Sequence, residues 1–399
     1  TKNDQILCRL SPSSDPEIAY EARLIRKIAS GPAKIVGLYR IGSEGGRVVP
    51  VDKKIDREYR VAKGDSMGAK EGELVEAQQT GPKGRMGLPT AKIIERLGDP
   101  MAPKAISLIA IHQHSIPDEF PEEVVAQAEA AKPAPLGKRK DLRDLPLFTI
   151  DPVDARDRDD AICAFPDDDP KNDGGYVVWV AIADVAWYVR PGTALDREAR
   201  NRGNSSYFPD RVVPILPDAL SGDLCSLHEN VDRACIAVRF VLNSAGRKIA
   251  HEFHRGIMRS PAALTYQQAQ AAADGTYDDA TEPLKEQIAD LFAAYRVASR
   301  ARHERQPLDL ELPERRIVLS DEGKVVSVAF RERLDAHKLV EEFLVPANVC
   351  AAETLEQKRS PLMYRVHEEP SPEKLDVLRE GADAAGLTMA KGQVLHTQH

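Results

Sequence analysis

Five aspartates fall within ten residues in the stretch LFTIDPVDARDRDDAICAF at positions 147–165, with apolar runs on both sides. Carboxylates this close repel one another, by about 4 kcal/mol for a pair ~4 Å apart at an effective dielectric constant near ~20. A divalent cation would compensate that repulsion, and hard oxygen ligands favour Mg²⁺ or Mn²⁺. A multi-carboxylate pocket beside a rigid strand is also what two-metal phosphoryl chemistry requires. The stretch therefore predicts a metal site, with its candidates among Asp151, Asp154, Asp157, Asp159 and Asp160.

An acidic stretch can also form a calcium loop or a solvated turn. An EF-hand loop starting at Asp151 would place Val153 at its third position and Arg156 at its sixth, where an oxygen ligand and a glycine are needed. A calcium loop is therefore disfavoured. A solvated acidic turn remains the alternative for the aspartate stretch, and it is the preferred interpretation of PDDDPKND at 166–173.

The histidines and cysteines form no comparable pattern. HEFH at 251–254 is one residue short of the zinc motif HExxH, and HQH at 112–114 alternates along an expected strand. The cysteines are odd in number, scattered and never in a CxxC pair, which indicates reduced thiols rather than disulfides or a zinc site. They are Cys8, Cys163, Cys225, Cys235 and Cys350.

Short strands and glycine turns dominate residues 31–117. The runs KIVGLYRI, GRVVPVD, REYRVAKGD, GELVEAQQT and LPTAKIIERLG form a five-strand pattern that is typical of a small barrel of the OB or cold-shock type. The outer face of such barrels often binds single-stranded nucleic acid. QILCRL and YEARLIRKI, within residues 1–30, resemble the last strands of a preceding barrel of the same kind.

A helix and a linker, at 118–146, separate the barrel from a second region that spans 147–399. PEEVVAQAEAA predicts the helix, and KPAPLGKRKDLRDLP combines proline, glycine and charge as linkers do. In the second region, YVVWVAIADVAWYV at 176–189 predicts a buried strand, and TALDREARNRG predicts a helix with a threonine cap and a glycine stop. Further helices are predicted at 281–306, 336–357 (with Pro346 as a kink) and 371–387, so this region is α+β.

Charge is spread unevenly along the chain. The formal net charge is -8, but residues 1–100 hold 18 Lys and Arg against 14 Asp and Glu, which leaves -12 for the remainder. A basic surface that guides a polyanion toward a carboxylate site would produce this asymmetry, and ordinary surface variation is the alternative. No apolar run approaches the roughly 18 residues of a membrane helix, and the first residues lack the apolar core of a signal peptide. The sequence therefore predicts a cytoplasmic protein with no membrane association.

Longer motifs give a more specific result. TIDPVDARDRDDA, followed by VAIADVAWYVRPGTALDREARNRGNSSYFPDRVVPILP and SGDLCSLHENVDR, resembles the catalytic (RNB) domain of the ribonuclease II and ribonuclease R family, and the ribonuclease R branch is the closer. The preceding barrel resembles that family's second cold-shock domain, and AHKLVEEFLVPANVCAA resembles a later helix of its catalytic domain. The resemblance covers nearly the whole chain, with the motifs in the family's order.

This resemblance implies a processive 3′-to-5′ exoribonuclease that uses Mg²⁺ to release nucleoside 5′-monophosphates from single-stranded RNA by a two-metal mechanism. The family's four motif aspartates correspond to Asp151, Asp157, Asp159 and Asp160, and Asp154 falls outside the pattern. They are the predicted catalytic and metal-binding residues. By the same resemblance, three side chains are expected to bind RNA, with Tyr207 stacking on the terminal base and the other two contacting the terminal nucleotides and their sugars: Tyr207, Tyr266 and Glu342.

Two departures from the family pattern modify this expectation. Leu310 stands where many members have a stacking phenylalanine, which predicts a weaker base clamp. The family's pattern SPIRRYxDL, with its catalytic arginine, and a final OB-type domain do not occur in the sequence. We therefore expect a monomeric internal fragment whose catalytic domain is incomplete at its C-terminal end, and which is weakly active or inactive. A non-catalytic RNA-binding fragment is the alternative function, and a structural calcium-binding protein is a distant third.

Overall fold

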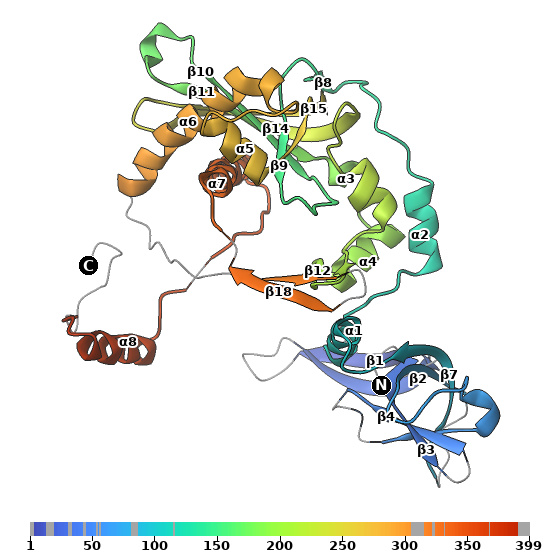
Figure 1. Cartoon of the computed structure of the whole chain (residues 1–399). Coiled ribbons are helices and arrows are strands. Elements are labelled where there is room, and N and C mark those ends of the chain that lie inside the picture. The colour runs from blue at the N-terminus through green and yellow to red at the C-terminus, as the bar shows by residue number, and fades with distance from the viewer. Residues whose placement is uncertain are drawn as a thin grey trace. The chain divides into compact units, whose positions relative to one another are not determined.

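The computed structural model describes residues 4–12, 20–30, 34–42, 45–52, 55, 57–80, 87–114, 116–304, 315–320, 324–330, 332–366 and 368–389. Leu310 lies outside them. Figure 1 shows the elements along the chain, which group into two compact units that are described separately. The first unit comprises Thr1–Phe120, Asn201–Ile215 and Arg315–Phe330, and the second comprises Pro121–Arg200, Leu216–Glu314 and Arg331–His399.

A closed five-stranded barrel dominates the first unit, with the strand order β3-β4-β5-β7-β6. Its strands are β3 (Lys34–Gly42), β4 (Gly45–Pro50), β5 (Tyr59–Val61), β6 (Leu74–Gln79) and β7 (Thr90–Gly98). Each predicted run supplies one of these strands. The prediction of a small OB or cold-shock barrel is therefore confirmed.

Every second side chain of a strand points into the barrel and fills it, because successive residues of a strand point to opposite faces. The buried set is Ile35, Tyr39, Val48, Tyr59, Val61, Ala69, Val75, Ala77, Ala91 and Ile93. Gly46 lies against the ring of Tyr39, and a Cβ atom there would come within 2.1 Å of Tyr39 Cε2. Only glycine allows that ring to lie across β4.

The segments that flank the barrel include one helix that the sequence did not predict. The expected strands near the N-terminus form an antiparallel pair, β1 (Asp4–Pro12) and β2 (Tyr20–Ser30). The HQH segment, however, ends the helix α1 (Pro103–Gln113), so the expected strand there is wrong. A proline at the first helical position and apolar residues four apart, Ala105 and Ile109, which pack in one cluster, favour the helix.

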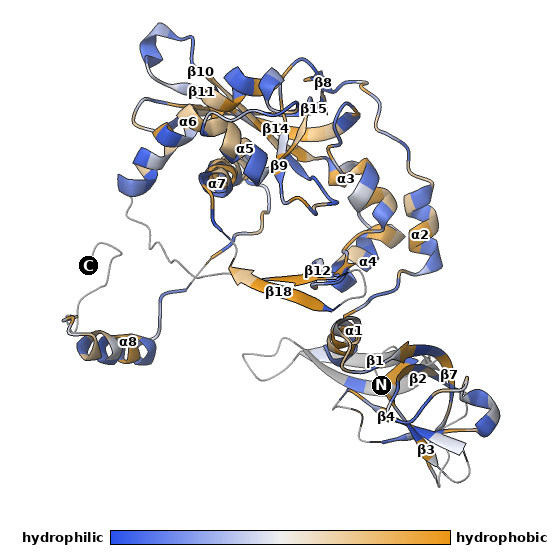
Figure 2. Cartoon of the chain, in the orientation of Figure 1, coloured by the Kyte–Doolittle hydropathy of each residue, from blue (hydrophilic) through white to orange (hydrophobic). Residues whose placement is uncertain are grey.

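Two short strand pairs complete the first unit. β12 (Ser206–Tyr207) pairs with β13 (Val212–Val213), and β17 (Arg315–Leu319) pairs with β18 (Val325–Phe330). Figure 2 shows β18 as a hydrophobic strand, yet every one of its side chains is exposed. β18 therefore presents an apolar surface.

The second unit is built on a five-stranded sheet with the order β10-β11-β14-β15-β8. Neighbouring strands are antiparallel, except that β8 runs parallel to β15. The strands are β8 (Lys140–Asp141), β10 (Asp160–Pro166), β11 (Tyr176–Ala183), β14 (Asp232–Leu242) and β15 (Lys248–Arg259).

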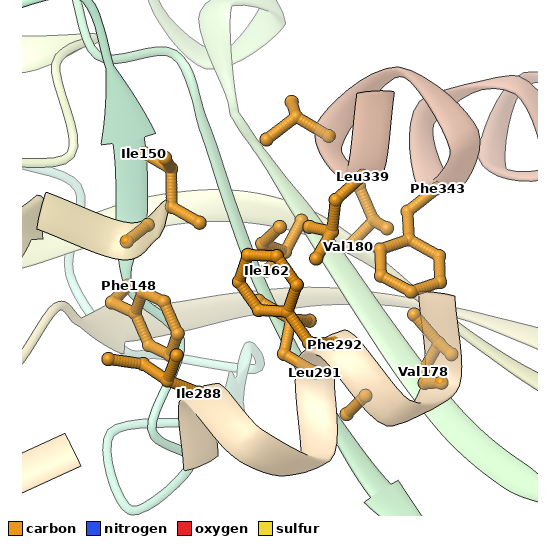
Figure 3. Packing of buried hydrophobic residues seen from close by; sticks show 14 of the residues in the cluster. Phe148, Ile150, Ile162, Val178, Val180, Ile288, Leu291, Phe292, Leu339 and Phe343 are labelled. Carbon is orange, nitrogen blue, oxygen red and sulfur yellow. The ribbon is translucent and has the colours of Figure 1, made fainter. Parts of the chain in front are cut away.

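Three helices, α5 (Tyr266–Ala273), α6 (Lys285–Glu304) and α7 (Asp335–Gln357), bury one face of this sheet. Apolar residues recur along α6 and α7 at intervals of three and four, which gives each helix one buried face. Figure 3 shows side chains of these two helices meeting side chains of β10 and β11. Helices on one face of a mainly antiparallel sheet confirm the predicted α+β class. The core at this contact includes Phe148, Ile162, Val178, Val180, Ile288, Leu291, Phe292, Leu339 and Phe343.

The remaining helices form where the sequence predicts them: α2 (Glu122–Glu129), α4 (Ala194–Arg202) and α8 (Pro372–Ala384). At the start of α4, the Thr193 hydroxyl accepts a hydrogen bond from the Asp196 N–H at 3.3 Å, and Gly203 after its end has φ +80°. All five cysteines are free thiols, as expected. No helix in the described part of the chain is long and apolar enough to cross a membrane.

The buried strand expected over 176–189 is shorter than predicted. β11 ends at Ala183, and a helical turn, α3 (Val185–Tyr188), follows. The residue between them, Asp184, is buried, and its carboxylate accepts hydrogen bonds from Arg255 at 2.6 and 2.9 Å. A buried carboxylate needs such partners, and this constraint ends the strand although the apolar pattern continues.

The fold predicts a large loss of stability for Phe148→Ala, because the Phe148 side chain is fully buried in the main core. Removing it should lower the free energy of unfolding of the second unit by about 3–5 kcal/mol. Denaturant unfolding would measure this change. The matched control, Val153→Ala, alters an exposed side chain five residues later and should stay within about 0.5 kcal/mol. Equal stability of the two variants would contradict the assigned core.

Candidate active site

The four predicted metal ligands lie at the ends of two strands and in the connection between them. Asp151 is the last residue of β9 (Thr149–Asp151), and Asp160 is the first residue of β10. Asp157 and Asp159 lie in the connecting loop, residues 152–159. Backbone hydrogen bonds of 3.0 and 3.3 Å between Phe148 and Ile162 join the two strands just outside the loop. The two buried strands thus hold all four aspartates at their adjacent ends or in the loop that connects them.

Further backbone contacts fix the second half of this loop. The Arg158 carbonyl accepts a hydrogen bond from the Leu227 N–H at 2.7 Å, and the Arg158 N–H donates to Ser226 Oγ at 3.1 Å. The Asp159 carbonyl accepts from the Ala183 N–H at 2.9 Å. The loop is therefore tied both to the end of β11 and to the segment before β14.

Burial and mutual repulsion raise the pKa values of three of the aspartates. Burial is the largest cause for Asp151, whose pKa rises to about 6; the nearby Thr149 hydroxyl and then the charge of Arg158 oppose the rise, and the charges of Asp159 and Asp157 add to it. Burial followed by the charges of Asp159 and Asp151 raises the pKa of Asp160 to about 7. The pKa of Asp159 also rises, because its carboxyl group is desolvated although the residue as a whole is exposed. These carboxyl groups therefore sense one another's charge.

A divalent cation fits this donor set in chemistry and in charge. Asp151 Oδ2 is buried and has no hydrogen-bond partner among the described residues. A buried carboxylate oxygen without a donor is costly, and a hard cation would satisfy it. The described residues nevertheless contain no group of three or more His, Cys, Asp or Glu side chains arranged to hold a metal ion. Convergence of all four aspartates on one cation stays a prediction.

Tyr266 is brought next to Asp151 by a short parallel strand pair. β16 (Ala263–Thr265) pairs with β9 so that Thr265 lies opposite Asp151, and Tyr266 follows as the first residue of α5. Thr265 caps α5 and forms a capping box with Gln268. The Tyr266 ring stacks on His337 of α7, with ring centroids 3.9 Å apart and planes 14° apart. The structure therefore places this aromatic ring on the element beside the aspartate loop.

Glu342 lies inside the helical layer. It is buried on α7, and its carboxylate accepts a hydrogen bond from Arg302 Nη1 of α6 at 3.2 Å. The neighbouring Glu341 is exposed and pairs with Arg333 at 2.8 Å. Removing either partner of this pair would leave an uncompensated charge between the two helices, and a ribose contact by Glu342 stays a prediction.

Tyr207 belongs to the first unit, whereas the other predicted site residues belong to the second. It is the last residue of β12, lies opposite Val212 of β13, and is 67% exposed. A largely exposed aromatic ring on a short strand is suited to stacking on a base.

The structure shows two sets of charged side chains that the sequence analysis missed, one at the aspartate loop and one on the barrel. Arg158 Nε lies 3.6 Å from Asp151 Oδ2, and the position of Arg158 between two predicted ligands was the available signal. In the barrel, Arg40 lies directly opposite Arg47, which in turn lies opposite Arg60. Alternation within the predicted strands could have shown that these arginines point outward, but only the register shows that they adjoin.

The chain combines a cold-shock-type barrel with an α+β unit that carries a carboxylate loop. This combination places it among multidomain proteins that join a barrel of this type to an α+β domain. The model of the RNB domain matches residues 139–398, and that of the cold shock domain matches residues 48–121. The chain belongs to the RNB-domain family, and the resemblance found in its motifs is confirmed.

The relatives and solved structures agree with that assignment. Ribonuclease R of Escherichia coli (strain K12) is 38% identical over 396 residues, which cover 98% of this chain and 48% of the relative. Ribonuclease R of Vibrio parahaemolyticus is 38% identical over 379 residues, covering 93% of this chain and 45% of the relative. The chain thus spans about half the length of these curated relatives.

Among solved structures, Mycoplasma genitalium RNase R in complex with ribose methylated single-stranded RNA has a similar fold. The TM-score is 0.80 at 23% sequence identity, and the match covers 99% of this chain and 63% of that chain. At this identity the likeness shows a shared fold.

The raised pKa of Asp160 predicts how stability depends on pH when a chelator removes divalent cations. Above pH ~4 the unfolded chain ionises this carboxyl group while the folded chain keeps it protonated, so the group destabilises the fold increasingly until pH reaches about 7. Asp160→Asn removes this penalty. The variant should therefore gain stability relative to the wild type between pH 5 and pH 7, by on the order of 1 kcal/mol. Thermal unfolding of both proteins across this range measures the difference, and a difference that does not change with pH would contradict it.

Proposed function

We propose that the whole protein is a processive 3′-to-5′ exoribonuclease that hydrolyses single-stranded RNA to nucleoside 5′-monophosphates with the help of two divalent cations, Mg²⁺ or Mn²⁺, and that this chain by itself is weakly active or inactive. One observation carries this proposal. The loop between β9 and β10 and the strand residues at its two ends carry the four predicted ligands, and the buried Asp151 Oδ2 has no hydrogen-bond partner among the described residues. Membership of the RNB-domain family and the similarity to Ribonuclease R support the reaction and the polarity.

In this mechanism the aspartates hold the cations, which would supply an activated water and stabilise the leaving 3′-oxygen. The chain's own residues bind and orient the RNA. Tyr207 stacks on a terminal base, which is worth about 1–3 kcal/mol and does not depend on sequence. We expect Tyr266, one residue beyond the partner of Asp151 in β16, to contact the terminal nucleotides. The main-chain contacts of Arg158 and Asp159 keep the loop in place during repeated cycles.

In the full-length protein, Asp159→Asn should abolish hydrolysis and spare RNA binding, because it removes a predicted ligand together with a charge that repels phosphate. We expect the rate of mononucleotide release from a labelled single-stranded RNA to fall by about 10²-fold or more in Mg²⁺. Affinity for the same RNA, measured in chelator, should stay equal or rise.

The control for this experiment is Asp154→Asn, which removes an exposed aspartate of the same loop that lies outside the family pattern. It should leave the rate of hydrolysis within about twofold. Equal losses in the two variants would contradict the assignment. Binding of RNA by the full-length wild type with no mononucleotide release in Mg²⁺ or Mn²⁺ would support the non-catalytic alternative instead.

The partner we propose is single-stranded RNA, and the barrel provides a surface for its phosphates. Three outward arginines, here called the arginine row, occupy directly opposite positions on β3, β4 and β5: Arg40, Arg47 and Arg60. Arg40 pairs with Glu71 at 3.0 Å and Arg47 pairs with Glu58 at 3.2 Å. Like charges directly opposite one another destabilise a sheet, so a row of three is better explained by a polyanion than by the fold.

Aromatic side chains cannot stack on bases on this part of the barrel. Tyr39 and Tyr59 are the two aromatic residues between positions 34 and 98, and both are buried in the barrel core. Binding there must depend on phosphate charge, and such binding weakens with salt in proportion to the number of phosphates neutralised.

Replacing all three residues of the arginine row by glutamine should weaken binding of single-stranded RNA and flatten its dependence on salt. Three lost phosphate contacts correspond to a change of about 2 in the slope of log K against log[salt]. Fluorescence anisotropy in chelator, which prevents hydrolysis, measures this slope. The opposite change, Glu58→Gln with Glu71→Gln, should strengthen binding. A triple variant with unchanged slope would show that RNA does not touch this surface, and its melting temperature should not fall, because repulsion is removed.

A further inference from the structure

Arg158 is an arginine embedded among predicted metal ligands, between Asp157 and Asp159 in the chain. Its main chain is held at both polar atoms, by Ser226 Oγ and by the Leu227 N–H. Both of these partners are buried residues. The position of the Arg158 backbone is therefore set by the fold, and its side chain, which is 23% exposed, extends from a fixed point.

The Arg158 side chain is directed at the aspartate with the unsatisfied oxygen. Its Nε atom lies 3.6 Å from Asp151 Oδ2, and neither atom has a hydrogen-bond partner among the described residues. At this distance the two groups attract by charge without forming a hydrogen bond. Such a contact is easily exchanged, because a cation bound directly to the carboxylate oxygen, at about 2.0–2.6 Å, would give that oxygen a much closer partner.

The other charges around Asp151 are carboxylates. The charges of Asp157 and Asp159 act on Asp151, and the charge of Asp151 acts on Asp160. Arg158 is the one cation that forms an ion pair with Asp151 within the described part of the chain. Arg156, two residues earlier in the same loop, is exposed and makes no ion pair with a described residue. The two arginines therefore have the same charge and the same loop, but different environments.

We propose that Arg158 is a built-in counter-ion of Asp151 that competes with the divalent cation for this carboxylate and so sets how tightly the site holds its metal. The inference rests on the metal site of the proposed function. When a cation binds, the Arg158 side chain must leave the Asp151 oxygen, while the Ser226 and Leu227 contacts keep the loop itself in place. Metal affinity is thereby lowered, and occupancy of the site becomes sensitive to the concentration of free divalent cation.

Direct metal binding tests this proposal without reference to RNA hydrolysis. Mn²⁺ binding to the full chain is measured by electron paramagnetic resonance of the free ion, and Mg²⁺ binding by calorimetry. Arg158→Gln removes the charge and should tighten binding by about tenfold, since a unit charge this close to a cation site in a partly buried loop repels strongly. Arg156→Gln is the matched control and should change affinity by less than about twofold, because its charge is screened by solvent. Arg158→Lys keeps the charge and should bind metal as the wild type does.

Thermal unfolding provides a second measurement that separates a counter-ion from a merely structural residue. In chelator, Arg158→Gln should melt below the wild type, because the carboxylates lose their compensating charge, and Mn²⁺ should restore its melting temperature to that of the wild type with Mn²⁺. A loss that Mn²⁺ does not restore, or unchanged or weaker Mn²⁺ binding by Arg158→Gln, would overturn the inference while leaving the proposed metal site intact. If the wild type binds no Mn²⁺ at millimolar concentrations, the metal site and the inference both fail.

Discussion

Repulsion between buried carboxylates is the constraint on which the organisation of the second unit depends. Strand β9 ends and strand β10 begins with an aspartate, and the Phe148–Ile162 bridge prevents these two ends from separating. The charges therefore cannot move apart. The protein must tolerate raised pKa values of the carboxyl groups, place a cationic side chain beside them, or bind a cation. The core under β9 and β10 provides the stability that offsets this repulsion.

Much of the architecture could be predicted from the sequence because it follows local patterns. Alternating strands with glycine turns predicted the barrel, and apolar residues at intervals of three and four predicted α6 and α7. The N-cap residue Thr193 and the glycine after the helix, Gly203, are also local signals, and they predicted the two ends of α4. The pattern failed at Asp184, because the end of β11 is decided by Arg255, which is 71 residues away in sequence. It fails again at α1, where the alternation over HQH predicts a strand although Pro103 starts a helix.

Some residues of the candidate site could likewise be predicted from nearby residues in the sequence, whereas the contacts of others depend on distant parts of the chain. The aspartates could be found because four predicted ligands lie within ten residues, and the family resemblance then identified which four. Arg158 was overlooked because its role depends on where Asp151 Oδ2 points, which spacing alone does not specify. The burial of Glu342 depends on Arg302 of another helix, and the arginine row depends on strand register. Such pairings are properties of the folded chain, and a one-residue change of register would abolish the row.

In the proposed function, the two charged features oppose one another in sign and serve complementary purposes. An RNA strand cannot approach a set of carboxylates unless cations first neutralise them, whereas the arginine row attracts phosphate without any metal. Binding energy gained on the barrel is therefore independent of the state of the aspartate loop. Under the two proposals, a chain that holds its metal only moderately, because Arg158 competes for Asp151, would keep RNA bound through the barrel while the metal site fills. In this arrangement, affinity for RNA depends on the arginine row and the rate of hydrolysis depends on the aspartate loop. A loss of either property can therefore be traced to its own set of residues.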